Sequence, residues 1–179
     1  MDTAQVKDKR PYAWGRFTAF GLIVAIVACT VDQASKFWLV DVFDLGNRGH
    51  VAVAPTLDFV LTWNTGISYG LFPQQGPVGQ WALLAFKAAA VVVLWIWLAR
   101  ASSRLAAASL GLIIGGAFGN AIDRLHWPGV MDFVLFHVAA PGWRFEWYVF
   151  NLADAAIVSG VVGLLYESLR GEAGAAKAP

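Results

Sequence analysis

Phe150-Asn151-Leu152-Ala153-Asp154 stands at the head of the last apolar run of the chain, which continues from Ala155 to Leu169. A carboxylate at the edge of a membrane helix is costly, because it loses much of its hydration there. Asn151 and Asp154 are three residues apart, so they share one face of a helix, and that face should point at protein or at a water-filled cleft. The simpler alternative is an aspartate that only caps its own helix.

A second carboxylate lies shortly before this run, in Gly129-Val130-Met131-Asp132-Phe133. We expect Asp132 and Asp154 to meet at the membrane surface and to carry out hydrolysis. Two close carboxylates suit that chemistry, because their mutual repulsion keeps one protonated and leaves the other ionised.

Composition identifies a membrane protein. Of the 179 residues, 58% are hydrophobic and only 14% are charged, against about 25% charged in soluble domains. The mean hydropathy is +0.58. A formal net charge of +1 gives no basic surface for nucleic acid. The single cysteine, Cys29, excludes a disulfide within one chain.

Four apolar segments are each long enough to cross a bilayer, at about 20 residues. They cover residues 17–39, 78–98, 105–122 and 150–169. The sequence therefore predicts an all-α membrane protein of one domain, residues 1–179, with four transmembrane helices. A rival interpretation takes the first segment as a cleaved leader, because Ile26-Val27-Ala28-Cys29 resembles a weak lipoprotein cleavage box. Cleavage there would leave three spans.

Basic residues at the ends of these segments predict the orientation. One side would carry Lys7, Lys9, Arg10, Arg16, Arg100, Arg104, Arg170 and Lys177. The two long stretches on the other side carry only Arg48, Arg124 and Arg144. Both termini should therefore be cytoplasmic, and the carboxylates should lie at the outer face.

Two outer segments are expected between the spans. Residues 40–76 do not have a helical pattern; Leu57 to Trp63 alternates as a half-buried strand does, and Val51 and Val53 suggest a partner strand across a turn at Pro55. This predicts a small extracytoplasmic β-sheet. The apolar stretch 133–140 is expected to lie flat as an outer lid, with aromatic residues near its ends in the headgroup layer.

Polar residues occur inside two spans. Asp32 and Lys36 are four apart and can pair on one helical face; in the alternative, they form an interfacial salt bridge with Lys36 extended outward. In the third span, Gly116, Asn120 and Asp123 form a row at helical spacing. We expect Asp123 and Arg124 to close that helix as a charged pair.

Small residues recur at every fourth position of the third span, at Ala107, Gly111, Gly115 and Gly119. Such a stripe lets another helix approach closely. The stripe predicts a packing edge on this span.

Other hydrolytic sites are less well supported. Gly66-Ile67-Ser68-Tyr69-Gly70 matches the G-x-S-x-G pattern of serine hydrolases. That pattern needs a helix directly after the serine, but Pro73 and Gly76 follow. The three histidines have no metal-ligand spacing.

Taken together, these motifs resemble the prolipoprotein (type II) signal peptidases of bacteria. The matching stretches, in chain order, are Asp32-Gln33-x-x-Lys36, Asn64-x-Gly66 continued to Gly70, Gly115 to Arg124, Gly129 to Phe133, and Phe150 to Asp154. The chain departs from the family at Tyr69, where phenylalanine is more usual, and in a longer stretch from His137 to Trp147, which affects the lid.

The resemblance implies an aspartyl endopeptidase of the bacterial inner membrane with Asp132 and Asp154 as its catalytic pair. The substrate would be a diacylglyceryl-modified prolipoprotein cut before the lipidated cysteine, globomycin-type peptides would inhibit it, and membrane lipids would surround it. No metal or organic cofactor is expected. The residues that would bind substrate or support the site are Asp32, Lys36, Asn64, Gly66, Gly116, Asn120, Asp123, Arg124, Asn151 and Ala153.

Two other classes of function remain open. A proton-coupled carrier also uses intramembrane Asp and Lys, but it should spread them through the depth of the bilayer. A non-catalytic helical scaffold has only the glycine stripe in its favour.

Reporter fusions test the orientation. A reporter at Gly46 and one at Ala140 should both report an external location, because both follow spans whose inner ends are basic. A cytoplasmic signal from either fusion would overturn this topology.

Overall fold

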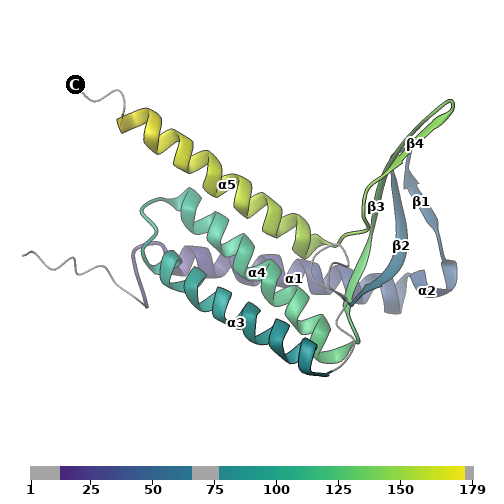
Figure 1. Ribbon diagram of the computed structural model, residues 1–179, viewed down its shortest axis with the longest axis horizontal. Helices are drawn as coiled ribbons and strands as arrows, with labels where there is room; N and C mark the ends of the chain where they lie inside the picture. Colours follow the sequence, from purple (N-terminus) through teal and green to yellow (C-terminus); the bar gives the residue numbers. More distant parts are fainter. Residues whose placement is uncertain (1–12, 66–76, 176–179) are drawn as a thin grey trace, which may run out of the picture.

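The computed structural model describes residues 13–65 and 77–175. Its elements, in chain order, are α1 (Thr18–Phe37), the π-helix η1 (Trp38–Val42), α2 (Leu45–Arg48), β1 (Val51–Ala54), β2 (Leu57–Asn64), α3 (Pro77–Ala99), α4 (Arg104–His126), β3 (Val130–Ala140), β4 (Trp143–Glu146) and α5 (Leu152–Ala175). The four long helices form a bundle, and the β-sheet crosses one end of it (Figure 1).

Three helical segments among the described residues are long and apolar enough to cross a membrane: Thr18–Val42, Arg104–His126 and Leu152–Arg170. They confirm three of the expected spans. The segment expected at 78–98 forms the 23-residue helix α3, whose described apolar part is Ala88–Ala99. A fourth membrane span stays a prediction.

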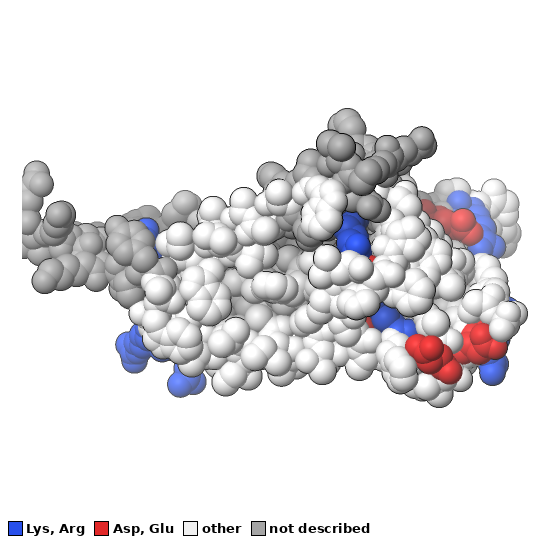
Figure 2. All heavy atoms as spheres, turned by 90° about the horizontal axis from the view of Figure 1, so that it is seen from below, with Lys and Arg blue, Asp and Glu red and all other residues white. Residues whose placement is uncertain are grey.

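The outside of the bundle is apolar. On the face that Figure 2 shows, a wide band of the described helices carries no Lys, Arg, Asp or Glu, and most charged side chains lie toward the two ends of the molecule. Large apolar side chains are exposed along α1 and α5, among them Ile23, Ile26, Val27, Val158, Val162 and Leu165. Such a surface suits contact with lipid tails.

The glycine stripe of α4 packs against α1, as the sequence predicted. A Cβ on Gly111 would meet the backbone of Gly21, and one on Gly115 would meet the backbone of Ala25. The neighbouring Gly116 lies against the backbone of Ala153 in α5. These glycines let α4 contact α1 on one side and α5 on the other.

The sheet is antiparallel with strand order β1-β2-β3-β4. The predicted β1–β2 hairpin with its turn at Pro55 is confirmed. The lid expected at 133–140 is corrected, because these residues belong to β3. Residues 131–135 of β3 are buried without interruption, so this strand lacks the alternation that identified β2.

The expectation that residues 40–76 contain no helix was also wrong. Residues 38–42 form η1 and residues 45–48 form α2. Leu39 and Leu45 are buried in these turns and contact a core with Met131, Phe133 and Val134. That apolar cluster holds the sheet to the end of α1.

Two histidines, one just before β1 and one in β3, meet the same aspartate of β2. The Nε2 atoms of His50 and His137 lie 2.6 Å and 3.0 Å from the same oxygen, Oδ2 of Asp58. Hydrogen bonding from His50, followed by that from His137, lowers the pKa of Asp58. The three histidines seemed scattered in the sequence because strand pairing, not helical spacing, brings two of them together.

Replacement of Gly115 by leucine tests the close packing of α4 on α1. The new side chain has no room against the backbone of Ala25, so Gly115→Leu should lower the free energy of unfolding by about 1–3 kcal/mol. Thermal unfolding in detergent measures the change. Val162→Leu, on an exposed face of α5, is the control and should leave stability unchanged; equal stability of both variants would contradict the packing.

Candidate active site

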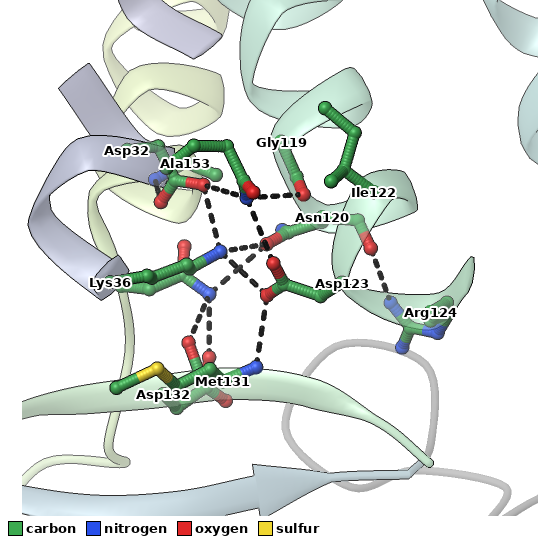
Figure 3. Close-up of polar contacts among 12 residues, drawn as sticks. Asp32, Lys36, Gly119, Asn120, Ile122, Asp123, Arg124, Met131, Asp132 and Ala153 are labelled. Atoms are coloured by element: carbon green, nitrogen blue, oxygen red, sulfur yellow. Dashed lines mark hydrogen bonds and ion pairs between the residues drawn. The ribbon is translucent and has the colours of Figure 1, made fainter. Parts of the chain in front are cut away.

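Four aspartates from four elements gather where the bundle meets the sheet. Asp32 comes from α1, Asp123 from α4, Asp132 from β3 and Asp154 from α5. The first three are buried, and Asp154 is half-buried. Figure 3 shows three of them, Asp32, Asp123 and Asp132, converging with Lys36 and Asn120 in one network. The carboxylates therefore cluster at one end of the helices.

Lys36 neutralises part of this charge from inside the protein. Its Nζ lies 2.8 Å from Asp32 Oδ2 and 2.7 Å from Asp123 Oδ2, and it is only 5% exposed. The predicted Asp32–Lys36 pair is thus confirmed. The alternative, in which Lys36 extends outward to water, is wrong, because α4 and Asp123 cover it.

Asp32 also connects α1 to the start of α5. Its Oδ1 accepts a hydrogen bond of 2.9 Å from the backbone N–H of Ala153. This N–H is in the first turn of α5, where no carbonyl of the helix is available to it. The negative side chain near this helix N-terminus is also favoured by the helix dipole.

Gln33 is a supporting residue that the sequence analysis named in a matching stretch but did not assign to the site. Its amide nitrogen donates to Asp123 Oδ1 at 2.8 Å and to the backbone oxygen of Gly119 at 3.1 Å. A polar side chain beside Asp32 in an apolar span was the available signal.

Asp123 connects α4 to the sheet. Its Oδ2 accepts a hydrogen bond of 3.0 Å from the backbone N–H of Met131 in β3. The expected charged pair of Asp123 and Arg124 at the end of the helix is corrected: α4 continues to His126, Asp123 pairs with Lys36, and Arg124 Nη1 donates to the backbone oxygen of Asn120.

Asn151 and Asp154 cap the N-terminus of α5 reciprocally. Asn151 Oδ1 accepts from the N–H of Asp154 at 2.9 Å, and Asp154 Oδ2 accepts from the N–H of Asn151 at 3.3 Å. This is the geometry of a capping box. Asp154 therefore does cap its own helix, as the simpler alternative expected. This cap uses only one of its two carboxylate oxygens.

The other oxygen of Asp154 faces the site. Asn120 Nδ2 donates to Asp154 Oδ1 at 2.9 Å, and Asn151 Nδ2 donates to Asn120 Oδ1 at 3.1 Å and to Asp132 Oδ1 at 2.6 Å. A continuous chain of hydrogen bonds thus runs from Asp154 through Asn120 and Asn151 to Asp132. This chain fixes both aspartates relative to each other.

Asp132 receives a further hydrogen bond, of 3.1 Å, from Asn64 Nδ2 in β2. Its burial, and next the negative charge of Asp154, raise the pKa of Asp132 to about 6. The hydrogen bonds from Asn64 and Asn151 act in the opposite direction. Burial prevails, so this carboxyl keeps its proton at a pH where an ordinary aspartate is ionised.

An open cavity of about 290 Å³ adjoins Asp132. It is lined by Thr62, Trp63, Asn64, Thr65, Asp132, Tyr148 and Val149. Two aromatic residues, Trp63 and Tyr148, are part of this lining. A peptide segment entering here would lie next to the Asp132 carboxyl.

The structure brings together nearly all residues that the sequence singled out. Gly66 and Ser68 lie outside the described residues. Within residues 13–65 and 77–175, no three side chains of His, Cys, Asp or Glu are arranged to hold a metal ion. The arrangement offers two carboxyl groups that are linked through the amides of Asn120 and Asn151, and one of them, Asp132, lines an open cavity.

Comparison with known proteins gives a consistent match. A family model described as signal peptidase (SPase) II matches residues 24–170. A lipoprotein signal peptidase of Nitrobacter hamburgensis is 60% identical over 159 residues, 89% of this chain and 96% of that protein. One from Methylorubrum extorquens is 54% identical over 155 residues, 86% and 88% of the two chains.

A solved structure has the same fold. It is described as a bacterial membrane enzyme determined by the in meso method at 2.3 Å. The TM-score is 0.71 at 20% identity, and the match covers 93% of this chain and 98% of that one.

Removal of Lys36 tests the buried ion cluster. Lys36→Met leaves two buried carboxylates without their cation, so it should lower the free energy of unfolding by about 3–5 kcal/mol. Arg144→Met is the control, because Arg144 and its partner Glu146 are both about half exposed, and it should cost less than about 1 kcal/mol. Thermal unfolding in detergent compares the two; equal losses would contradict a buried cluster.

The pKa of Asp132 predicts a pH-dependent effect of Asp132→Asn on stability. A raised pKa means that the folded state binds a proton more tightly than the unfolded state, so the wild type loses stability as pH rises from about 4 to about 7. Asparagine does not titrate. The variant should therefore gain about 2 kcal/mol relative to wild type over this range, measured by unfolding at both pH values; a constant difference would refute the raised pKa.

Proposed function

We propose, from the premise that this chain belongs to the signal peptidase II family, that Asp132 and Asp154 are its catalytic pair. The family cleaves signal peptides from prolipoproteins, so the chain is a peptidase of a bacterial membrane. The observation that carries the proposal is the hydrogen-bonded chain from Asp154 through Asn120 and Asn151 to Asp132, together with the raised pKa of Asp132.

The two carboxyl groups would share one proton, which belongs to the pair as a whole. The ionised carboxylate takes a proton from water while the water oxygen attacks the carbonyl carbon of the scissile peptide bond. The protonated carboxyl donates its proton to the carbonyl oxygen, giving a tetrahedral diol. Collapse of this diol moves a proton to the leaving nitrogen and breaks the C–N bond, which releases the signal peptide as a carboxylic acid.

The surroundings of Asp132 and Asp154 suggest which of them acts first as the acid and which as the base. Asp132 is the more deeply buried aspartate and has the raised pKa, so it would hold the shared proton. Asp154 accepts hydrogen bonds on both oxygens, at a helix N-terminus that favours negative charge. We therefore assign to Asp154 the role of the base that activates the water.

The remaining polar residues would support this pair. Asn64, Asn120 and Asn151 donate hydrogen bonds that orient the two carboxyl groups. Asp32, Lys36 and Asp123 hold α1, α4 and β3 in place behind them. Arg124, Gly66, Gly116 and Ala153 complete the proposed set, with Gly116 and Ala153 in close contact between α4 and α5.

The substrate proposed is a diacylglyceryl-modified prolipoprotein, cut just before the lipidated cysteine. Its acyl chains would lie along the apolar outside of the bundle, and its scissile bond would reach the carboxyl pair at the membrane surface. Globomycin-type peptides would compete for this place. The site would face outward from the inner membrane, with both termini in the cytoplasm.

A proton-coupled carrier is the second candidate. It predicts ionisable residues at several depths along the helices. In the described residues, Asp32, Lys36 and Asp123 instead lie at the sheet end of α1 and α4, next to Asp132 and Asp154. This clustering favours hydrolysis at one surface over transport across the bilayer.

Conservative substitution tests the carboxyl pair. Asparagine has nearly the size of aspartate but cannot act as a base, so Asp132→Asn and Asp154→Asn should each abolish cleavage of a lipidated prolipoprotein by the purified protein. The double variant should be little worse than either single one, because the two residues act as a unit. The pH–rate profile of the wild type should be bell-shaped, with an alkaline limb where the pair loses its shared proton.

Ser68→Ala is the control for a serine mechanism and should retain most activity. Asp32→Asn should weaken activity only in part. Near wild-type cleavage rates in both Asp132→Asn and Asp154→Asn would refute the proposed pair. If Ser68→Ala lost as much activity as these two variants, a serine nucleophile would be favoured instead.

A further inference from the structure

An open groove lies on the face of the bundle where α3 and α5 flank α4. Both helices pack on α4, and Figure 1 shows α4 between them. The groove has a volume of about 520 Å³, and all of its lining side chains except that of Ser168 are apolar. The lining comes from all three helices: Leu94 and Trp97 from α3, Ile113 from α4, and Val161, Leu164, Leu165 and Ser168 from α5. A groove of this kind between apolar helices suits an apolar occupant.

The α5 wall of this groove leads to Asp154. Val161, Leu165 and Ser168 follow that residue at intervals of seven, four and three positions, so they share its face of the helix. Val158, which is 55% exposed, lies on the same line between the groove and the aspartate. The face of α5 that lines the groove therefore ends at one member of the carboxyl pair.

The α4 floor of the groove leads to the same place. Ile113, Ala117 and Asn120 are spaced four and three residues apart, so they share one face of α4. Ala117 carries only a methyl group, so no large side chain of α4 stands between the groove and Asn120. Asn120 Nδ2 donates a hydrogen bond of 2.9 Å to Asp154 Oδ1. Floor and wall thus meet at the carboxyl pair.

A second groove of similar size has a different course. It is lined by α1, α3 and α4 and has a volume of about 510 Å³. Its α1 residues Ile26 and Cys29 continue at helical spacing to Gln33 and Lys36. Both of these side chains contact Asp123. This groove therefore leads to the buried ion cluster and serves as a comparison for the first one.

The length of the first groove matches a known kind of peptide segment. At 1.5 Å per residue, Val161 lies about 10 Å and Ser168 about 21 Å from Asp154 along the axis of α5. The apolar stretch of a signal peptide has about 7–15 residues, which as a helix measure about 10–22 Å. A helix is also the form in which a single segment satisfies its backbone groups in lipid. Such a stretch would reach from the carboxyl pair along the groove.

We propose that the α3–α4–α5 groove binds the apolar stretch of the signal peptide, as a helix antiparallel to α5 whose C-terminal end lies at Asp132 and Asp154. The family cleaves signal peptides from prolipoproteins, so this stretch stands just before the cut. The acyl chains are attached after the cut and lie outside this groove. The assignment rests on the proposed function, because it takes the cut to occur at the carboxyl pair.

A bulky side chain in the groove tests this assignment. Val161→Trp fills the groove, and Val162→Trp is the matched control, because Val162 is the next residue, is 58% exposed and does not line the groove. Each purified variant receives two substrates. One is a complete lipidated prolipoprotein, and the other is a short lipopeptide that keeps the diacylglyceryl cysteine and the residues at the cut but lacks the apolar stretch.

Val161→Trp should raise KM for the prolipoprotein about tenfold with kcat little changed, because it removes binding that is equal in the ground and transition states. KM for the short lipopeptide should stay the same, and Val162→Trp should change neither. Equal KM values of the two variants for the prolipoprotein would overturn the proposal. A KM raised equally for both substrates would overturn it in favour of an acyl chain in the groove, because both substrates carry acyl chains.

Cross-linking keeps the proposal testable if Val161→Trp folds poorly. Cys29 is the only cysteine, so Val161→Cys, Val162→Cys and Ile26→Cys are each made in a Cys29→Ala, Asp154→Asn background. The prolipoprotein carries one free cysteine at each of four successive positions in turn, about seven residues before the cut, so that every face of its helix is sampled. A disulfide needs Cα atoms within about 4.4–6.8 Å. Oxidation should join the signal peptide to position 161 severalfold more than to position 162 or 26.

Equal cross-linking at the three positions would overturn the proposal. Stronger cross-linking at position 26 would overturn it in favour of the second groove. A protein dimer joined through position 161 that prolipoprotein does not displace would overturn it in favour of a second copy of the chain.

Cleavage assays separate this proposal from the proposed function. If Asp132→Asn and Asp154→Asn still cleave while the cross-link at position 161 stands, the carboxyl pair fails and the signal-peptide groove remains. If both variants lose cleavage and position 161 does not cross-link, the groove fails and the carboxyl pair remains.

Discussion

The ammonium group of Lys36, held between the carboxylates of Asp32 and Asp123, is the interaction on which the rest of the site depends. These residues belong to α1 and α4, and Asp32 and Asp123 also accept backbone hydrogen bonds from Ala153 in α5 and Met131 in β3. One buried ion cluster therefore joins three helices and the sheet. A buried charge is tolerated only when it is paired and hydrogen-bonded, so the four elements have little freedom to shift at this point.

This constraint explains why Asp132 and Asp154 can be held together although like charges repel. The cluster places β3 and the start of α5 side by side, and Asn120 and Asn151 then supply hydrogen bonds to both carboxyl groups. The helix end stabilises Asp154, while burial raises the pKa of Asp132. Two aspartates in adjacent but unlike environments are the arrangement that acid–base hydrolysis requires.

Much of this arrangement follows from the sequence, because apolar length and helical spacing are local properties. Length identified three spans, the four-residue spacing of Asp32 and Lys36 predicted their pair, and the glycine stripe predicted the packing of α4. The partners of these residues could not be predicted in the same way. Lys36 meets Asp123, and His50 meets His137 near Asp58, only through tertiary contacts. Strand β3 was missed because burial on both faces removes the alternation that reveals a strand.

The central claim is that Asp132 and Asp154 share one proton, and an infrared titration of the purified protein tests it most directly. The account predicts a protonated carboxyl band that persists to about pH 6, is absent in Asp132→Asn, and titrates at lower pH in Asp154→Asn, because the neighbouring negative charge is gone. A band that is unchanged in both variants, or an Asp132 carboxyl already ionised at about pH 4 as in an ordinary aspartate, would contradict it.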